Sequence, residues 1–437
     1  MNCNRNSADF STISSVSAAF GLLLAGLLSV AAVDAQAQTA TVPAVAAAPA
    51  ASAPMLRAEV AKPLQAAQDA IKAGNNKEAL ARLAEAEAQP GLTPYELYII
   101  QRLKGPAAFG AGDLTLAAGQ FEAALASPLM PEADRKAITE TTVKLLLQLK
   151  DYPRAGRLMG SFLGAGSSSP ELARLYPQVL AVLGDHAGVL RVLAPELAAD
   201  AAAKRSTPEA TLRLLAASQS ALKDMPAYTV TLEKLAGNTG KAEYWTELIA
   251  RTVRRDGFAD ERLRLDVYRL RRAIGLPLDA AEVGDMANLA QQAGLPAEAQ
   301  ALLDDGFSSG LLGKDANAAA DKKLREASTK AAAQDRATLA DSETSASKAK
   351  DGNVAQGLAL ALSATGAQER ALAMLALAQS KGGLRRPDEA LLHLGLVQWR
   401  AGKPDDARRS FAAVRGSDGT ADLARLWGLY LDSPARK

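Results

Sequence analysis

The sequence predicts an all-α protein in which helical hairpins stack into an α-α superhelix, a helical repeat solenoid. Three observations predict this fold class. First, a pattern of glycine, alanine and a large apolar residue recurs along most of the chain. Second, 48% of the residues are hydrophobic but only 4% are aromatic, so alanine and leucine, the strongest helix formers, must build the core. Third, the sequence lacks the alternating runs of Val, Ile, Thr and aromatic residues that indicate strands.

The recurring pattern has a steric explanation. Glycine ends one helix because it accepts the left-handed conformation without a side-chain clash. Five positions later, alanine lets the second helix cross the first closely, and a large apolar residue one turn further on fills the groove. The pattern occurs at Gly74/Ala79/Leu83, Gly112/Ala117/Phe121, Gly294/Ala299/Leu303, Gly366/Ala371/Leu375 and Gly402/Ala407/Phe411. Weaker turns at Lys150, Gly184, Lys223 and Gly257 fill the intervals, so most steps are about 34 to 39 residues.

The last unit of this pattern resembles the tetratricopeptide repeat family. Leu394 and Gly395 stand at the family's Leu-Gly position in the first helix, ahead of Gly402, Ala407 and Phe411. Other units match in part, with Ala287 and Ala359 in place of that glycine, and Gly419 stands where the family has its closing proline. The resemblance implies a tetratricopeptide-like superhelix whose concave surface binds a protein or peptide.

The N-terminal residues predict export. Residues 1–37 are typical of a bacterial signal peptide, with an apolar core from Ala18 to Val33 and a cleavage site after Ala37. An uncleaved membrane anchor is the rival interpretation, although the apolar run is short for a membrane span. Cleavage would remove Cys3, the only cysteine, and leave no predicted transmembrane segment. We therefore expect a periplasmic or secreted bacterial protein without disulfides.

The remaining chain divides by composition. Residues 38–61 are rich in Ala and Pro and predict a disordered tether, followed by an N-terminal helical repeat array over 62–312. Residues 313–352 are polar and predict either a degenerate repeat or a hinge. Residues 353–437 predict tetratricopeptide-like repeats and a capping helix that contains Leu426, Trp427 and Tyr430.

The inventory of reactive residues predicts no enzyme, cofactor or metal site. His186 and His393 are the only histidines, and we expect both on the surface or in a groove. Gly306 to Gly310 matches the G-x-S-x-G pattern of serine hydrolases, but a helix is expected before Ser308 where a nucleophile elbow requires a strand. The net charge of +2 gives no indication of nucleic-acid binding.

Candidate partner-binding residues lie in one arginine-rich segment and beside it. Residues 251–272 hold eight arginines against four acidic residues, which predicts either a solvated helix with internal salt bridges or a basic stripe for an acidic partner. Trp245 is the better aromatic candidate for a partner contact, whereas Trp399 is expected to pack in the core. The candidates are Tyr244, Trp245, Arg254, Arg255, Arg262 and Arg269.

These observations favour a non-enzymatic scaffold or adaptor that binds a protein or peptide in the bacterial envelope. Two alternatives remain open: a carrier or polysaccharide-binding module in cell-wall or exopolysaccharide assembly, and an enzyme that acts on such polymers. The sequence does not define the oligomeric state.

Overall fold

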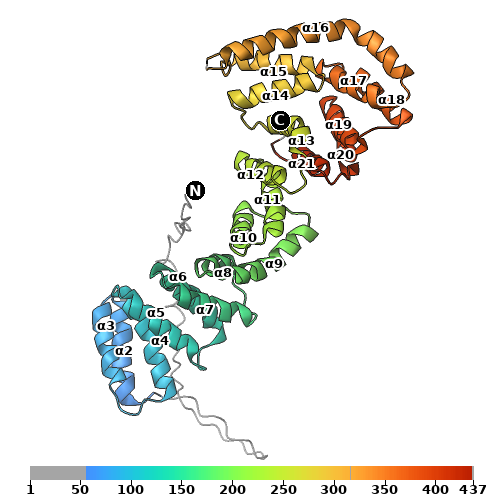
Figure 1. Cartoon of the computed structure of the whole chain (residues 1–437). Helices are drawn as coiled ribbons and strands as arrows, with labels where there is room; N and C mark the ends of the chain where they lie inside the picture. Colours follow the sequence, from blue (N-terminus) through green and yellow to red (C-terminus); the bar gives the residue numbers. More distant parts are fainter. Residues whose placement is uncertain (1–55, 315, 436–437) are drawn as a thin grey trace, which may run out of the picture. The chain divides into compact units, whose positions relative to one another are not determined.

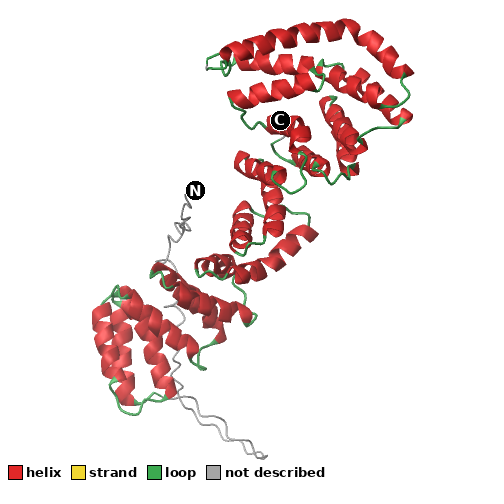
Figure 2. Ribbon diagram, in the orientation of Figure 1, coloured by secondary structure: helices red, strands yellow, loops and turns green. Residues whose placement is uncertain are grey.

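The computed structural model describes residues 56–314 and 316–435. All regular elements within these two ranges are helices, as Figure 2 shows. The predicted signal peptide, residues 1–37, and most of the predicted tether, residues 38–61, lie outside the described part. The array begins at Ala58, slightly before the predicted start. The all-α prediction is confirmed.

The chain forms two compact units, with a boundary after Glu196. The helices are labelled in Figure 1. The N-terminal unit contains α2 (Ala58–Lys72), α3 (Asn76–Glu87), α4 (Pro94–Gly110), α5 (Leu114–Ala126), α6 (Glu132–Gln148), α7 (Tyr152–Gly164), α8 (Pro170–Val182) and the first part of α9 (His186–Ala202). The C-terminal unit continues with α10 (Glu209–Ala221), α11 (Met225–Thr239), α12 (Ala242–Val253), α13 (Asp260–Ile274), α14 (Ala280–Gln292), α15 (Pro296–Ser308), α16 (Ala318–Lys348), α17 (Asn353–Ala364), α18 (Gln368–Lys381), α19 (Pro387–Arg400), α20 (Pro404–Ala413) and α21 (Thr420–Asp432).

The predicted turns join helices that are neighbours in sequence. Each turn residue has a positive φ angle, at Gly74, Gly112, Lys150, Gly184, Lys223, Gly257, Gly294, Gly366 and Gly402. After α2, for example, the N–H of Asn75 donates to the carbonyl of Ala70 at 2.8 Å, which caps the helix beyond Gly74. The predicted alanines Ala79, Ala117, Ala299, Ala371 and Ala407 are all fully buried.

The close helix crossing depends on a matched pair of residues. A Cβ added to Gly395 would lie 2.4 Å from Phe411, and one added to Gly105 would lie 2.5 Å from Phe121. Glycine thus faces phenylalanine in these two hairpins. In the other three hairpins of the strong pattern, alanine occupies the glycine position and leucine the phenylalanine position, as in the pairs Ala67/Leu83, Ala287/Leu303 and Ala359/Leu375.

The polar segment 313–352 is neither a degenerate helical hairpin nor a hinge. Most of it forms α16, a single helix of 31 residues that packs on α15 and α17. The segment from 314 to 351 contains neither Gly nor Pro, so nothing in it breaks the helix. The prediction of a degenerate repeat or a hinge does not describe this single helix, because it followed the repeat period and overlooked the absence of Gly and Pro.

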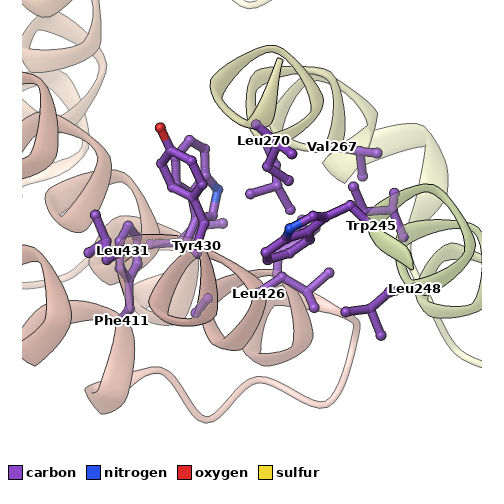
Figure 3. Close-up of a cluster of buried hydrophobic side chains, with 14 of the residues drawn as sticks. Trp245, Leu248, Val267, Leu270, Phe411, Leu426, Tyr430 and Leu431 are labelled. Atoms are coloured by element: carbon purple, nitrogen blue, oxygen red, sulfur yellow. The ribbon is translucent and has the colours of Figure 1, made fainter. Parts of the chain in front are cut away.

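The C-terminal unit closes on itself through its last helix. Within this unit, α21 packs against α19 and α20, and also against α11 and α13 (Figure 1). Figure 3 shows Trp245 of α12 pointing toward Leu426 of α21, beside Leu270 of α13. Trp427 of α21 is fully buried and lies 5.0 Å from Trp399 between ring centroids. The predicted capping helix therefore covers the last hairpin and also joins it to the start of the unit.

Candidate functional site

The two aromatic candidates on α12 have different surroundings. Trp245 has no exposed surface and belongs to the core between α12, α13 and α21. Tyr244 is partly exposed, and its hydroxyl donates to a carboxylate oxygen of Glu209 at 2.7 Å. Burial and this hydrogen bond raise the pKa of Tyr244. The structure thus assigns Trp245 to packing, and the predicted partner contact does not fit a fully buried indole.

Arg269 is likewise an interior residue. Its guanidinium donates to Asp266 at 2.7 Å and to Glu298 at 2.9 Å, and all three side chains are buried. His393 Nε2 lies 3.1 Å from the second oxygen of Asp266, and Arg400 also donates to Glu298. This buried ionic network joins α13, α15 and α19. The expectation that His393 lies on the surface or in a groove was wrong, because the histidine pairs with a carboxylate in the interior.

The charges of the network stabilise one another. Burial alone would raise the pKa of Asp266, but the interactions with His393 and Arg269 lower it. Burial also opposes ionisation of Glu298, yet Arg269 holds its pKa at about 2. A buried charge without its partner is costly, so the network favours the packing of α13 and α15 against α19, which lies much further along the chain.

Arg255 and Arg262 connect the beginning of the C-terminal unit to its end. Arg255 pairs with Asp422 at 2.7 Å and donates to the carbonyl of Ser417 at 3.0 Å. Arg262 lies between Glu389 and Asp418 and pairs with both. These arginines therefore serve the closure onto α19 and α21, and only Arg255 also reaches an open surface.

That open surface is a hollow of about 410 Å³ on α11 and α12. We call it the arginine hollow; it is lined by Thr229, Glu247, Ala250, Arg251, Arg254 and Arg255. Arg251 is held by Glu247 at 3.0 Å and lies 4.5 Å above the ring of Tyr228. Arg254 is exposed and has no ion pair among the described residues. Three guanidinium groups thus surround one carboxylate, which leaves positive charge for an incoming anion.

Sequence reasoning missed the acidic partners of these arginines. Glu389, Asp418 and Asp422 are more than a hundred residues away along the chain from the arginines they pair with. Their only sequence signal is their place at the starts of α19 and α21, where acidic residues are common for local reasons. The arginine-rich segment spans the end of α12, a turn and most of α13, and its arginines pair both within the segment and with residues on other helices.

The structure also locates the G-x-S-x-G segment of the sequence. Ser308 is the last residue of α15, so the G-x-S-x-G segment follows a helix and does not form a strand-turn-helix elbow. Among the residues that the structure describes, no group of three His, Cys, Asp or Glu side chains is placed to hold a metal ion. In the same residues, no helix is long and apolar enough to cross a membrane.

Comparisons with known proteins give a likeness among solved structures. No protein-family model matches the chain, and no curated protein matches it. Among solved structures, the chain is similar to one titled "Structure of Naa15/Naa10 bound to HypK-THB", with 16% sequence identity and a TM-score of 0.29. The match covers 86% of this chain and 67% of the other. The assignment as a helical repeat protein rests on the stacked helix pairs themselves.

Proposed function

We propose that this protein is a tetratricopeptide-like scaffold of the bacterial envelope, and that it binds an acidic segment of a protein partner at the arginine hollow. The stacked helix pairs support the scaffold role, because such arrays present long surfaces and few enclosed cavities. The observation that carries the site is Arg254, an exposed guanidinium that has no ion pair with any described residue and lies beside two arginines held in place.

The hollow suits a carboxylate better than a neutral or basic group. Arg251 and Arg255 already have one acidic partner each, so their guanidinium groups are oriented before a ligand arrives. Arg254 adds a positive charge that the acidic partners of Arg251 and Arg255 do not neutralise. Since arginine binds carboxylates in a bidentate geometry, an Asp or Glu side chain or a chain terminus fits this site.

The glycan-carrier alternative has less support. It depended on aromatic side chains exposed along a groove, yet Trp245 and Trp427 are fully buried and Trp399 packs on Trp427. We therefore do not propose it as a second function. Export remains part of our proposal and rests on the sequence of residues 1–37 alone.

Site-specific photo-crosslinking tests the proposal in intact cells. A photoreactive amino acid replaces Thr229, which lines the hollow, and a control probe replaces Lys234, which is exposed elsewhere on α11. We expect a defined protein partner to crosslink at Thr229 and not at Lys234. Arg254→Glu should weaken capture at least about tenfold, while Arg254→Lys keeps part of it.

Two results would oppose the proposal. Recovery of glycan without protein would favour the carrier alternative, and equal capture by Arg254→Glu and the parent chain would remove the hollow from the site. Fractionation of cells that express the chain with and without residues 1–37 tests export separately. Equal distribution of the two forms would contradict the envelope location.

A further inference from the structure

A second hollowed surface lies in the N-terminal unit, along α7. Two adjoining hollows of about 430 and 460 Å³ share Gly160, Tyr176, Leu180 and Asp185 in their walls. Together we call them the α7 trough. Its remaining lining residues are Pro153, Gly156, Arg157, Ser161, Leu163, Gly164, Leu183, Gly188, Arg191 and Val192.

The floor of the trough follows from the sequence of α7. Gly156, Gly160 and Gly164 are spaced four residues apart and so share one face of the helix. A Cβ on Gly156 would lie 2.9 Å from Leu183, and one on Gly160 would lie 2.6 Å from the hydroxyl oxygen of Tyr176. These two glycines let α8 pack closely. A Cβ on Gly164 would meet nothing within 4 Å, so the trough stays open there.

The walls of the trough present apolar surface to solvent. Leu183 is 41% exposed at the end of α8, and its neighbour Val182 is 44% exposed. Tyr176 is partly exposed and lines both hollows. Apolar surface in a hollow is more favourable for binding than isolated apolar residues on a convex surface, because a partner side chain can be buried on several sides.

The charges at the trough are unequal. Arg157 of α7 and Arg191 of α9 are exposed, and neither has an ion pair among the described residues. By contrast, Arg154 nearby is paired with Glu122 and Asp151. The one acidic residue in the lining, Asp185, accepts the N–H of Gly188 at 2.8 Å and caps the start of α9. Two cations therefore face solvent across a site whose single carboxylate already has a partner.

We propose that the α7 trough binds a short protein segment in which apolar residues alternate with Asp or Glu. The apolar side chains enter the two hollows that Tyr176 lines, and the carboxylates pair with Arg157 and Arg191. Charge complementarity selects the acidic segment, and the exposed Leu183 selects the apolar residues. This site uses no residue of the arginine hollow, so the protein carries one docking surface in each unit.

The test begins with a random short-peptide library displayed on phage and selected on the full chain. We expect enrichment of peptides that combine Leu, Ile or Phe with Asp or Glu. A selected peptide is then synthesised with a fluorescent label, and its affinity for variants of the chain is measured by anisotropy. Peptides without acidic residues, or binding that persists in every trough variant, would overturn the proposal.

Matched variants separate binding from folding. A Cβ added at Gly164 meets nothing within 4 Å, so Gly164→Leu should project into the trough and weaken peptide binding at least about tenfold without lowering the melting temperature. Gly119→Leu on α5, where an added Cβ also meets nothing within 4 Å, is its control and should bind normally. Arg157→Glu and Arg191→Glu should each weaken binding about tenfold, whereas Arg174→Glu, exposed elsewhere on α8, should not.

The readout distinguishes this inference from the proposed function. Loss of peptide binding in Gly164→Leu with normal crosslinking at Thr229 would support two separate surfaces. Equal peptide affinity for Gly164→Leu and the parent chain would refute the trough and leave the arginine hollow untouched. Binding to vesicles of anionic phospholipid that depends on Arg157 and Arg191, without selection of acidic peptides, would also refute it.

Discussion

The pairing of Gly395 with Phe411 gives a quantitative test of the close helix crossing. A Cβ at Gly395 would lie 2.4 Å from one ring carbon of Phe411 and 2.6 Å from the next, about 1 Å short of ordinary van der Waals contact. The ring cannot easily move away, because it is buried and stacks on Trp427 at 5.9 Å. We expect this overpacking to cost about 1 to 3 kcal/mol.

Helix propensity opposes this cost and must be measured separately. Replacing a helical glycine by alanine stabilises a helix by about 0.8 to 1 kcal/mol when nothing clashes. Gly119→Ala on α5 measures that contribution, because an added Cβ there meets no atom within 4 Å. Because the propensity gain is common to both substitutions, Gly395→Ala should be less stable than Gly119→Ala by the overpacking cost alone, about 1 to 3 kcal/mol.

The double variant Gly395→Ala/Phe411→Leu recreates the alanine–leucine pair found in three other hairpins. Urea unfolding of the parent, both single variants and the double variant completes a double-mutant cycle. We expect a favourable coupling energy of about 1 to 3 kcal/mol, so that the double variant is more stable than Gly395→Ala alone. Additive effects of the two substitutions would refute the reasoning about matched sizes.

Three further predictions concern turns, charges and packing. Lys150→Gly should raise the free energy of unfolding by about 0.5 to 1 kcal/mol, because Lys150 has a φ of 58°, which glycine adopts without strain. Its control, Lys136→Gly inside α6, should lower the free energy of unfolding by about 1 kcal/mol. The pKa of Glu298 is lowered in the folded chain, so its ionised form should add about 3 kcal/mol to the free energy of unfolding. This stabilisation should be present above the pKa of about 4.3 in the unfolded chain and be lost as the pH falls toward 2. Acid titration of the stability difference between the parent and Glu298→Gln checks this, and a difference independent of pH would contradict it. Ala407→Leu should destabilise the C-terminal unit by about 1 to 3 kcal/mol, and an unchanged melting temperature would count against the close crossing at the fully buried Ala407.

Local features of this fold could be predicted because they depend on residues close together in sequence. A left-handed residue is needed wherever two helices join in a tight turn, so Gly74 and Gly402 mark turns without any knowledge of the rest. The same logic located Lys150 and Lys223, although lysine rarely adopts a positive φ. The same local reasoning accounts for α16, because residues 314–351 lack the Gly and Pro that most often interrupt a helix.

The closure of the C-terminal unit could not be predicted in this way. Each hairpin specifies its own turn and its nearest neighbours, but the sum of many small rotations decides whether distant hairpins meet. The sequence of α13 shows that arginines are abundant. It does not show that Arg262 lies between Glu389 and Asp418, or that Asp266 pairs with His393.

The candidate site could be predicted only in part, because it too depends on long-range contacts. The arginine-rich segment does contain the arginines of the hollow. However, some of its arginines are exposed and others are buried, and this difference depends on long-range contacts. Arg254 is exposed whereas Arg269 is enclosed, although both lie in similar local sequence. The α7 trough was not predicted, although the spacing of Gly156, Gly160 and Gly164 is visible in the sequence, because a row of glycines can be buried or open.

Hydrogen–deuterium exchange of the last helix tests the central claim, that α21 closes the C-terminal unit. A helix sandwiched between α19–α20 and α11–α13 opens only when the unit opens. Amides of Thr420–Asp432 should therefore exchange as slowly as those of Asp260–Ile274, and Arg262→Ala should accelerate both together. Rapid exchange of Thr420–Asp432 alone, as at a fraying chain end, would contradict the closure.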